Sequence, residues 1–119
     1  MRVLVTAGPT REYLDAVRFL SNPSTGKMGF ACARAAARAG HEVVLVTGPV
    51  VLPDPPGVRC VRVVSADEMC RAVMKEYPRS DAAIMTAAVG DYKPAERFAG
   101  KLKKKAGALT LRLLRTRDI

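Results

Sequence analysis

The amino-acid sequence predicts an α/β fold with a mainly parallel sheet, and three observations carry this prediction. Four short apolar runs are each followed by Gly, Ser, Thr or Asp, as expected of buried strands. One helical segment lies between the first two runs, and another lies between the last two. Parallel neighbours need long connections that usually contain a helix. The order strand, helix, strand, strand, helix, strand therefore indicates a Rossmann-like α/β domain.

Each element has its own signal. The expected strands are 3–5, 43–46, 61–64 and 82–85, with a last strand within 109–114. The first helix is expected over 29–39, with Gly40 as its stop. The second begins with a capping box, Ser65-Ala66-Asp67-Glu68, and runs to about Tyr77 before Pro78. Residues 48–57 contain four prolines and are expected to form an irregular loop.

Length and composition limit the classes of protein. A chain of 119 residues, 49% of them hydrophobic, can bury one core, so we expect a single domain over 1–119. No apolar run reaches about 18 residues and no leader precedes the first strand, which predicts a cytoplasmic protein without a membrane partner. The three cysteines lack a paired spacing and His41 is the only histidine, so we expect reduced thiols and no metal site.

The net charge of +9 would suit a polyanionic partner. However, the arginines are scattered and are not interleaved with exposed aromatic residues. Only Lys101-Leu102-Lys103-Lys104-Lys105 is dense, and such a run is more often a solvated loop than a binding site. We therefore expect no nucleic-acid partner, and an oligonucleotide-binding protein that uses 101–105 is a disfavoured alternative.

Two polar loops indicate a nucleotide site. Residues 21–30 join an Asn, hydroxyls, a Lys and glycines to the first helix, whose dipole favours an anion at its start. Residues 6–12 follow the first strand, and ligands of open α/β sheets bind beyond the carboxyl ends of the strands. Neither G-x-G-x-x-G nor the Walker pattern is present, which disfavours ordinary NAD and P-loop sites.

Five motifs follow one another along the chain: Ala7-Gly8-Pro9-Thr10-Arg11-Glu12, Asp15-Ala16-Val17-Arg18-Phe19-Leu20-Ser21-Asn22, Ser24-Thr25-Gly26-Lys27-Met28-Gly29, Ala87-Ala88-Val89-Gly90-Asp91-Tyr92 and Lys101-Leu102-Lys103-Lys104. In this order they resemble bacterial phosphopantothenoylcysteine synthetase. The resemblance implies a CTP-dependent ligase of coenzyme A biosynthesis that joins 4'-phosphopantothenate to cysteine, with Mg²⁺ or Mn²⁺, on a Rossmann-like homodimer. The substrate carboxylate would attack the α-phosphate of CTP to give an acyl-cytidylate, and the cysteine amine would then displace CMP.

The resemblance also implies residue roles. It assigns Lys101 to the activation step, and Asn22, Arg18 and Ala88 to conversion of the acyl-cytidylate. Each of the last three also has a structural explanation: an Asx turn before Pro23, a solvated helix face and strand-end packing, respectively.

A second group of residues is expected at the nucleotide. Gly8 and Thr10 would let the first turn approach the triphosphate, and Ser24, Gly26 and Lys27 would hold phosphate at the helix start. Turn chemistry alone also explains the two glycines. Asp91 would contact the sugar or base, and a loop-capping Asp is its alternative.

The chain departs from the family pattern in a few places. Gly90 stands where Ala is usual, and Thr25 stands where Ser is usual. The family domain continues past Ile119, so we expect a three-layer sandwich that is incomplete at the C-terminus and an isolated chain that is marginally stable or associates. The alternative function is an inactive or split fragment that keeps nucleotide or phosphate binding, with a separate decarboxylase or a complementing chain as partner.

Overall fold

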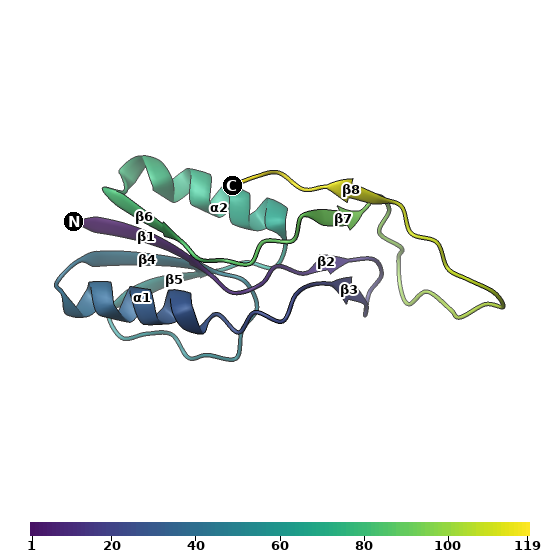
Figure 1. Cartoon of the computed structure of the whole chain (residues 1–119), viewed down its shortest axis with the longest axis horizontal. Helices are drawn as coiled ribbons and strands as arrows, with labels where there is room; N and C mark the ends of the chain where they lie inside the picture. Colours follow the sequence, from purple (N-terminus) through teal and green to yellow (C-terminus); the bar gives the residue numbers. More distant parts are fainter.

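A parallel sheet with one helix on each face forms the body of the molecule. The computed structural model describes all residues, 1–119. The sheet has the order β5-β4-β1-β6, and α1 and α2 cover its opposite faces (Figure 1). The bounds are β1 (Arg2–Ala7), α1 (Lys27–Arg38), β4 (Glu42–Thr47), β5 (Val58–Arg62), α2 (Ala66–Glu76) and β6 (Ala82–Met85). The expected α/β class and order of elements are confirmed.

Both faces of β1 and β4 are buried, because successive side chains of a strand point to opposite faces. One core joins α1 to the sheet and consists of Val3, Val5, Ala7, Phe30, Ala33, Val43 and Leu45. The other joins α2 to the sheet and consists of Leu4, Val44, Val46, Val63, Met69 and Val73. This double burial explains why the two strands are continuous apolar runs in the sequence.

The helix ends follow local chemistry. Helix α1 starts at Lys27, two residues before the expected start, and its N-cap Gly26 has φ 79°. Helix α2 has the expected cap, since Ser65 Oγ accepts from the Glu68 amide at 3.1 Å. The Glu68 carboxylate accepts from the Val64 amide at 2.8 Å, one residue before the expected partner. A short 3₁₀ turn, η1 (Tyr77–Arg79), ends this segment.

Two small antiparallel pairs lie beyond the carboxyl end of the sheet. β2 (Glu12–Tyr13) pairs with β3 (Phe19–Leu20), and β7 (Tyr92–Pro94) pairs with β8 (Leu113–Arg115). Residues 95–112 join β7 to β8 and extend away from the body, which gives the molecule a long axis of 58 Å (Figure 1). Neither α1 nor α2 has the length and apolar character that a membrane span requires.

β2, β3 and β7 were not predicted, and two of the expected strands are displaced. β5 spans Val58–Arg62 where 61–64 was expected, because its register is set by pairing Val43 with Val58 and Thr47 with Arg62. As an edge strand it carries exposed arginines, which interrupt the apolar run. The last strand, β8, is shorter than the expected 109–114 and is shifted toward the C-terminus.

Candidate functional site

The loops that follow β1 and β6 are joined beyond the sheet. Pro9 and Ala88 form an isolated parallel bridge. The Ala88 amide donates to Gly8 O at 2.9 Å, and the Thr10 amide donates to Ala88 O at 3.3 Å. The loop after β1 and the loop after β6 are thereby fixed side by side.

Asn22 is bonded to the second of these loops. Its Nδ2 donates to Ala88 O at 2.7 Å, and its Oδ1 accepts from the Ser24 amide at 3.1 Å. The second contact is the Asx turn that sequence reasoning gave as the structural alternative. A side-chain amide has two N–H groups, so one N–H of Asn22 is left without a protein partner. Asn22 is therefore both held in place and able to donate to a ligand.

The two glycine turns pack against each other. Gly8 has φ 73° and Gly26 has φ 79°, a region that disfavours other residues. A Cβ at Gly26 would lie 3.4 Å from the Gly8 Cα and 2.9 Å from Val50 Cγ1. Close packing thus explains both glycines without a ligand, as the turn-chemistry alternative proposed.

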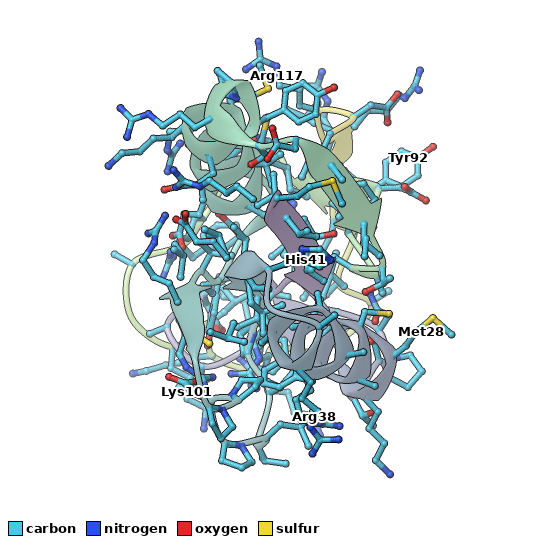
Figure 2. The ribbon with its side chains drawn as sticks, turned by 90° about the vertical axis from the view of Figure 1, so that its left-hand side faces the viewer. Met28, Arg38, His41, Tyr92, Lys101 and Arg117 are labelled. Atoms are coloured by element: carbon cyan, nitrogen blue, oxygen red, sulfur yellow. The ribbon has the colours of Figure 1, made fainter.

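A hollow of about 330 Å³ opens at the start of α1. Its lining consists of Pro23, Ser24, Thr25, Gly26, Lys27, Met28, Gly29 and Thr86. Lys27 is exposed, and Met28 points away from the body (Figure 2). This hollow combines a cationic side chain with the free amides of a helix N-terminus, which suits an anion.

Thr10 lies inside the protein. It is 0% exposed, and its hydroxyl accepts from the Gly90 amide at 2.8 Å. Its carbonyl accepts from Ser21 Oγ at 2.7 Å. Thr10 therefore holds the 88–90 loop in place, and a direct approach to a triphosphate would require the loop to move.

Asp91 faces open space. Its side chain makes no hydrogen bond, so no contact supports the loop-capping alternative. With Asn22 and Gly90 it lines a second hollow of about 300 Å³, to which Glu12 and Tyr92 also contribute. The structure thus brings Asn22, Ala88 and Asp91 to one place.

Arg18 and Lys101 lie apart from these hollows. Arg18 lies between β2 and β3 and not in a helix, so the alternative explanation of a solvated helix face is wrong. Its Nη1 donates to Asp15 Oδ2 at 2.7 Å and to Leu102 O at 3.0 Å. Lys101 is exposed on the 95–112 segment, on the other side of the view from Met28 (Figure 2). The predicted residues therefore form two groups.

Two buried carboxyl groups that sequence reasoning did not single out connect these loops. Glu12 is 5% exposed and accepts from the Ala66 amide at 2.8 Å, at the start of α2. Burial raises the pKa of Glu12, and the Ala66 N–H offsets this only in part. Burial would also raise the pKa of Asp15, but hydrogen bonds from Leu102, Val17 and Arg18 outweigh it and hold that pKa well below its usual range. The only feature of the sequence that could have pointed to these two residues is that each belongs to one of the family motifs, 7–12 for Glu12 and 15–22 for Asp15.

Comparison with known proteins defines the family. Residues 1–119 match the DNA/pantothenate metabolism flavoprotein C-terminal domain. The chain belongs to this family. It is 51% identical over 118 residues to the coenzyme A biosynthesis bifunctional protein CoaBC of Bacillus subtilis, covering 98% of this chain and 29% of that protein. It is 48% identical over 122 residues to CoaBC of Escherichia coli, covering 100% and 30%. The chain thus spans less than a third of the length of these relatives.

Solved structures agree with the family. The C-terminal domain of CoaBC superposes with a TM-score of 0.84 at 45% identity, over 98% of this chain and 54% of that one. The DNA/pantothenate metabolism flavoprotein from Streptococcus pneumoniae superposes with a TM-score of 0.86 at 25% identity, over 100% and 62%. The Rossmann-like architecture of the family domain is therefore confirmed for this chain.

The donor set of the flavoprotein domain does not form a metal cage. No group of three or more His, Cys, Asp or Glu side chains is close enough to hold an ion. Mg²⁺ commonly binds through one or two carboxylates together with substrate phosphates and water.

Proposed function

We propose that this chain carries the site of a CTP-dependent ligase that joins 4'-phosphopantothenate to cysteine in coenzyme A biosynthesis. The family and the likeness to CoaBC support the pathway. The observation that carries the proposal is the hydrogen bond from Asn22 Nδ2 to Ala88 O, which links two family motifs 66 residues apart. Asn22 lines the second hollow, and the residues that follow it, Pro23 and Ser24, line the first.

The first step requires cations. The substrate carboxylate forms a bond to the α-phosphorus of CTP, and the α–β bridging oxygen leaves with pyrophosphate. Both reactants are anions, so positive charge must offset their repulsion. We assign this to Lys101, which the exposed 95–112 segment would have to bring to the hollows, while Ser24, Gly26 and Lys27 hold phosphate at the start of α1.

The second step requires a fixed donor. The cysteine amine attacks the acyl carbon, its proton is lost to water or a nearby base, and CMP leaves with the bonding electrons. Charge develops on the acyl oxygen, and we assign the free N–H of Asn22 to donate to it. Ala88 fixes Asn22 through its carbonyl, and Arg18 offers a guanidinium to an anionic part of the substrate.

The nucleotide and its ion complete the proposal. The Asp91 carboxylate is free to accept from a ribose hydroxyl or the cytosine amine, and Gly8 keeps the first turn close to the start of α1. Mg²⁺ or Mn²⁺ would neutralise phosphate charge when it is bound with CTP. We also propose the family's homodimer, in which a decarboxylase is fused or separate.

Pyrophosphate release tests the proposal. The purified chain is mixed with 4'-phosphopantothenate, CTP and magnesium, with and without cysteine. We expect Lys101→Gln to lower release by about a hundredfold and the matched Lys105→Gln to leave it unchanged. We expect Asn22→Ala to lose the amide product while a first turnover of pyrophosphate persists. Equal loss in both lysine variants would contradict the assignment of Lys101.

A second candidate is a split or inactive fragment that binds nucleotide only. The observation in its favour is that Arg18 and Lys101 do not line either of the two hollows. Calorimetric titration with CTP and magnesium distinguishes the two. Binding without pyrophosphate release from a folded sample would favour the fragment, and turnover would exclude it.

A further inference from the structure

Leu102 is held by both of its backbone groups. Its amide donates to Asp15 Oδ2 at 2.9 Å, and its carbonyl accepts from Arg18 Nη1 at 3.0 Å. Arg18 Nη1 also donates to Asp15 Oδ2 at 2.7 Å, which closes a three-residue ring. We call Asp15, Arg18 and Leu102 the Asp15 clamp. It joins the turn before β3 to a segment more than 80 residues later in the sequence.

Two backbone hydrogen bonds extend the same contact. The Ala16 amide donates to Gly100 O at 2.9 Å, and the Phe98 amide donates to Leu14 O at 2.8 Å. Residues 98–102 therefore lie along residues 14–18. The following residues, 103–110, are exposed. The clamp is thus the last anchor before the free part of the long segment.

The two oxygens of Asp15 have different tasks. Oδ1 accepts from the amides of Val17 and Arg18 at 2.8 and 2.7 Å and shapes the local turn. Oδ2 accepts only from the distant Leu102 amide and from Arg18. Asp15 is 0% exposed, so a carboxylate here requires all of these donors. A local turn alone would need only one oxygen.

We propose that Asp15 is a positioning residue that fixes the lysine segment 101–103 against the turn that carries Arg18, so that Lys101 and Arg18 present their charges together. The inference rests on the proposed function for the chemistry of Lys101. The clamp itself is a property of the fold. No contact of Asp15 with substrate is implied.

The clamp leaves Arg18 available. Only Nη1 takes part in it, the side chain is 45% exposed, and Arg18 makes no other side-chain hydrogen bond. Its remaining N–H groups face solvent in a fixed orientation. Lys101 is adjacent to Leu102 and is also exposed. The segment pairing therefore holds the backbones that carry these two cations next to each other, which suits an anionic group of a substrate.

Asp15→Asn tests the clamp directly. Asparagine keeps an oxygen for the amides of Val17 and Arg18, but it turns an NH₂ toward the Leu102 amide and Arg18. We expect exchange of the Leu102 amide with solvent, followed by NMR on the full chain, to rise by at least about tenfold while β1 and β4 stay protected. The matched control is Asp81→Asn, which weakens the acceptor of the Arg2 amide at 2.6 Å and is expected to leave Leu102 unchanged. Equal protection of Leu102 in wild type and Asp15→Asn would overturn the clamp.

Leu102→Pro tests the clamp by removing the donor in place of the acceptor. It removes the Leu102 N–H and leaves the Asp15 carboxylate with its local donors and Arg18. We expect faster exchange of the Ala16 and Phe98 amides. If Asp15→Asn does not fold, this variant decides: unchanged exchange at Ala16 and Phe98 would overturn the clamp.

Pyrophosphate release tests the positioning role. We expect Asp15→Asn to lower the rate of the first turnover by about tenfold in the wild-type background. We expect no further loss in Lys101→Gln, because Arg18 is assigned to the later step and a residue that acts on the first step through Lys101 has no effect without it. Losses that multiply would overturn the positioning role. If the wild-type chain releases no pyrophosphate but Leu102 loses protection in Asp15→Asn, the clamp stands and the proposed function fails.

Discussion

Asn22 and Asp15 use their side chains in the same way at the scale of the residue. Each holds its own turn with one oxygen, which accepts from a nearby amide. Each then reaches a distant residue with its second polar atom: Ala88 for Asn22 and Leu102 for Asp15. The Asx turn and the functional role are therefore not alternatives, because the turn fixes the direction in which the second atom points.

Gly29 shows where a close approach controls stability. A Cβ at this position would lie 2.4 Å from Ala7 Cβ and 2.5 Å from Thr86 Oγ1. Helix propensity alone favours Ala over Gly by about 1 kcal/mol, but overpacking costs about 1–3 kcal/mol. We expect Gly29→Ala to lower the free energy of unfolding, measured by urea denaturation.

The control for this prediction is Gly90→Ala. A Cβ there would lie 3.2 Å from Thr10 Oγ1, a tight contact but a longer one than the two at Gly29. We expect Gly90→Ala to lower the free energy of unfolding by less than Gly29→Ala does. A Gly29→Ala protein as stable as wild type would show that α1 moves away from β1 at little cost.

At the scale of the elements, Glu12 joins β2 to the start of α2 and should lower stability at neutral pH. Its raised pKa means that the native state binds the proton more tightly than the unfolded state, whose pKa is about 4.3. The contribution of Glu12 is therefore full below that value and is lost as pH rises through the native pKa. We expect Glu12→Gln, which keeps an oxygen for the Ala66 amide, to melt at a higher temperature than wild type at pH 7. The difference should narrow toward pH 4 when melting is followed by circular dichroism.

The pKa of Glu76 is shifted in the opposite direction, so this residue serves as the control. It ends α2, and a hydrogen bond from Arg59 lowers its pKa against the effect of burial, with Arg2 adding to the effect. Its contribution is present above the unfolded pKa and is lost as pH falls through the native one. Glu76→Gln should therefore melt below wild type at pH 7 and approach it in acid. Parallel curves for both variants would contradict these pKa directions.

The elements also show what the sequence could predict. Buried runs with caps and stops, such as β1, β4 and α2, were found because both faces or one helical stripe are apolar. The two-residue strands β2 and β3 have no periodicity to detect. β5 carries arginines because it is an edge strand. Its bounds are set by pairing with β4 and not by the strand propensity of its residues, so the sequence prediction was displaced.

The site was also predictable only in part. Motif resemblance placed Asn22 and Ala88 in one site, and the structure brings them into contact, although their chemical roles stay predictions. The Asp15 clamp was beyond sequence reasoning, since its partners are 87 residues apart and Leu102 contributes only backbone atoms. No side-chain pattern reports a contact of that kind.

For the whole molecule we predict self-association of the isolated chain. β6 pairs with β1 on one side only, and Met85 on this open edge is 49% exposed. The extended segment 95–112 adds exposed Leu109, and β8 adds exposed Leu113 and Leu114. Unpaired strand edges with apolar side chains promote pairing between chains. We expect the sedimentation coefficient to rise with concentration between about 5 and 200 µM, the range in which exposed edges associate. A compact monomer throughout, with a single cooperative melting transition, would contradict this.

The long reach of the Asn22 and Asp15 contacts also has a consequence for biogenesis. Residues 1–47 can begin to pair as soon as they leave the ribosome, because β1 and β4 are early in the chain. Asn22 must wait for Ala88, and Asp15 must wait for Leu102. Contacts between distant residues form late, since closing long loops is slow. In a nascent chain, most of the hydrophobic core would thus form before the site does. Ligand binding would then report that synthesis has passed these late residues.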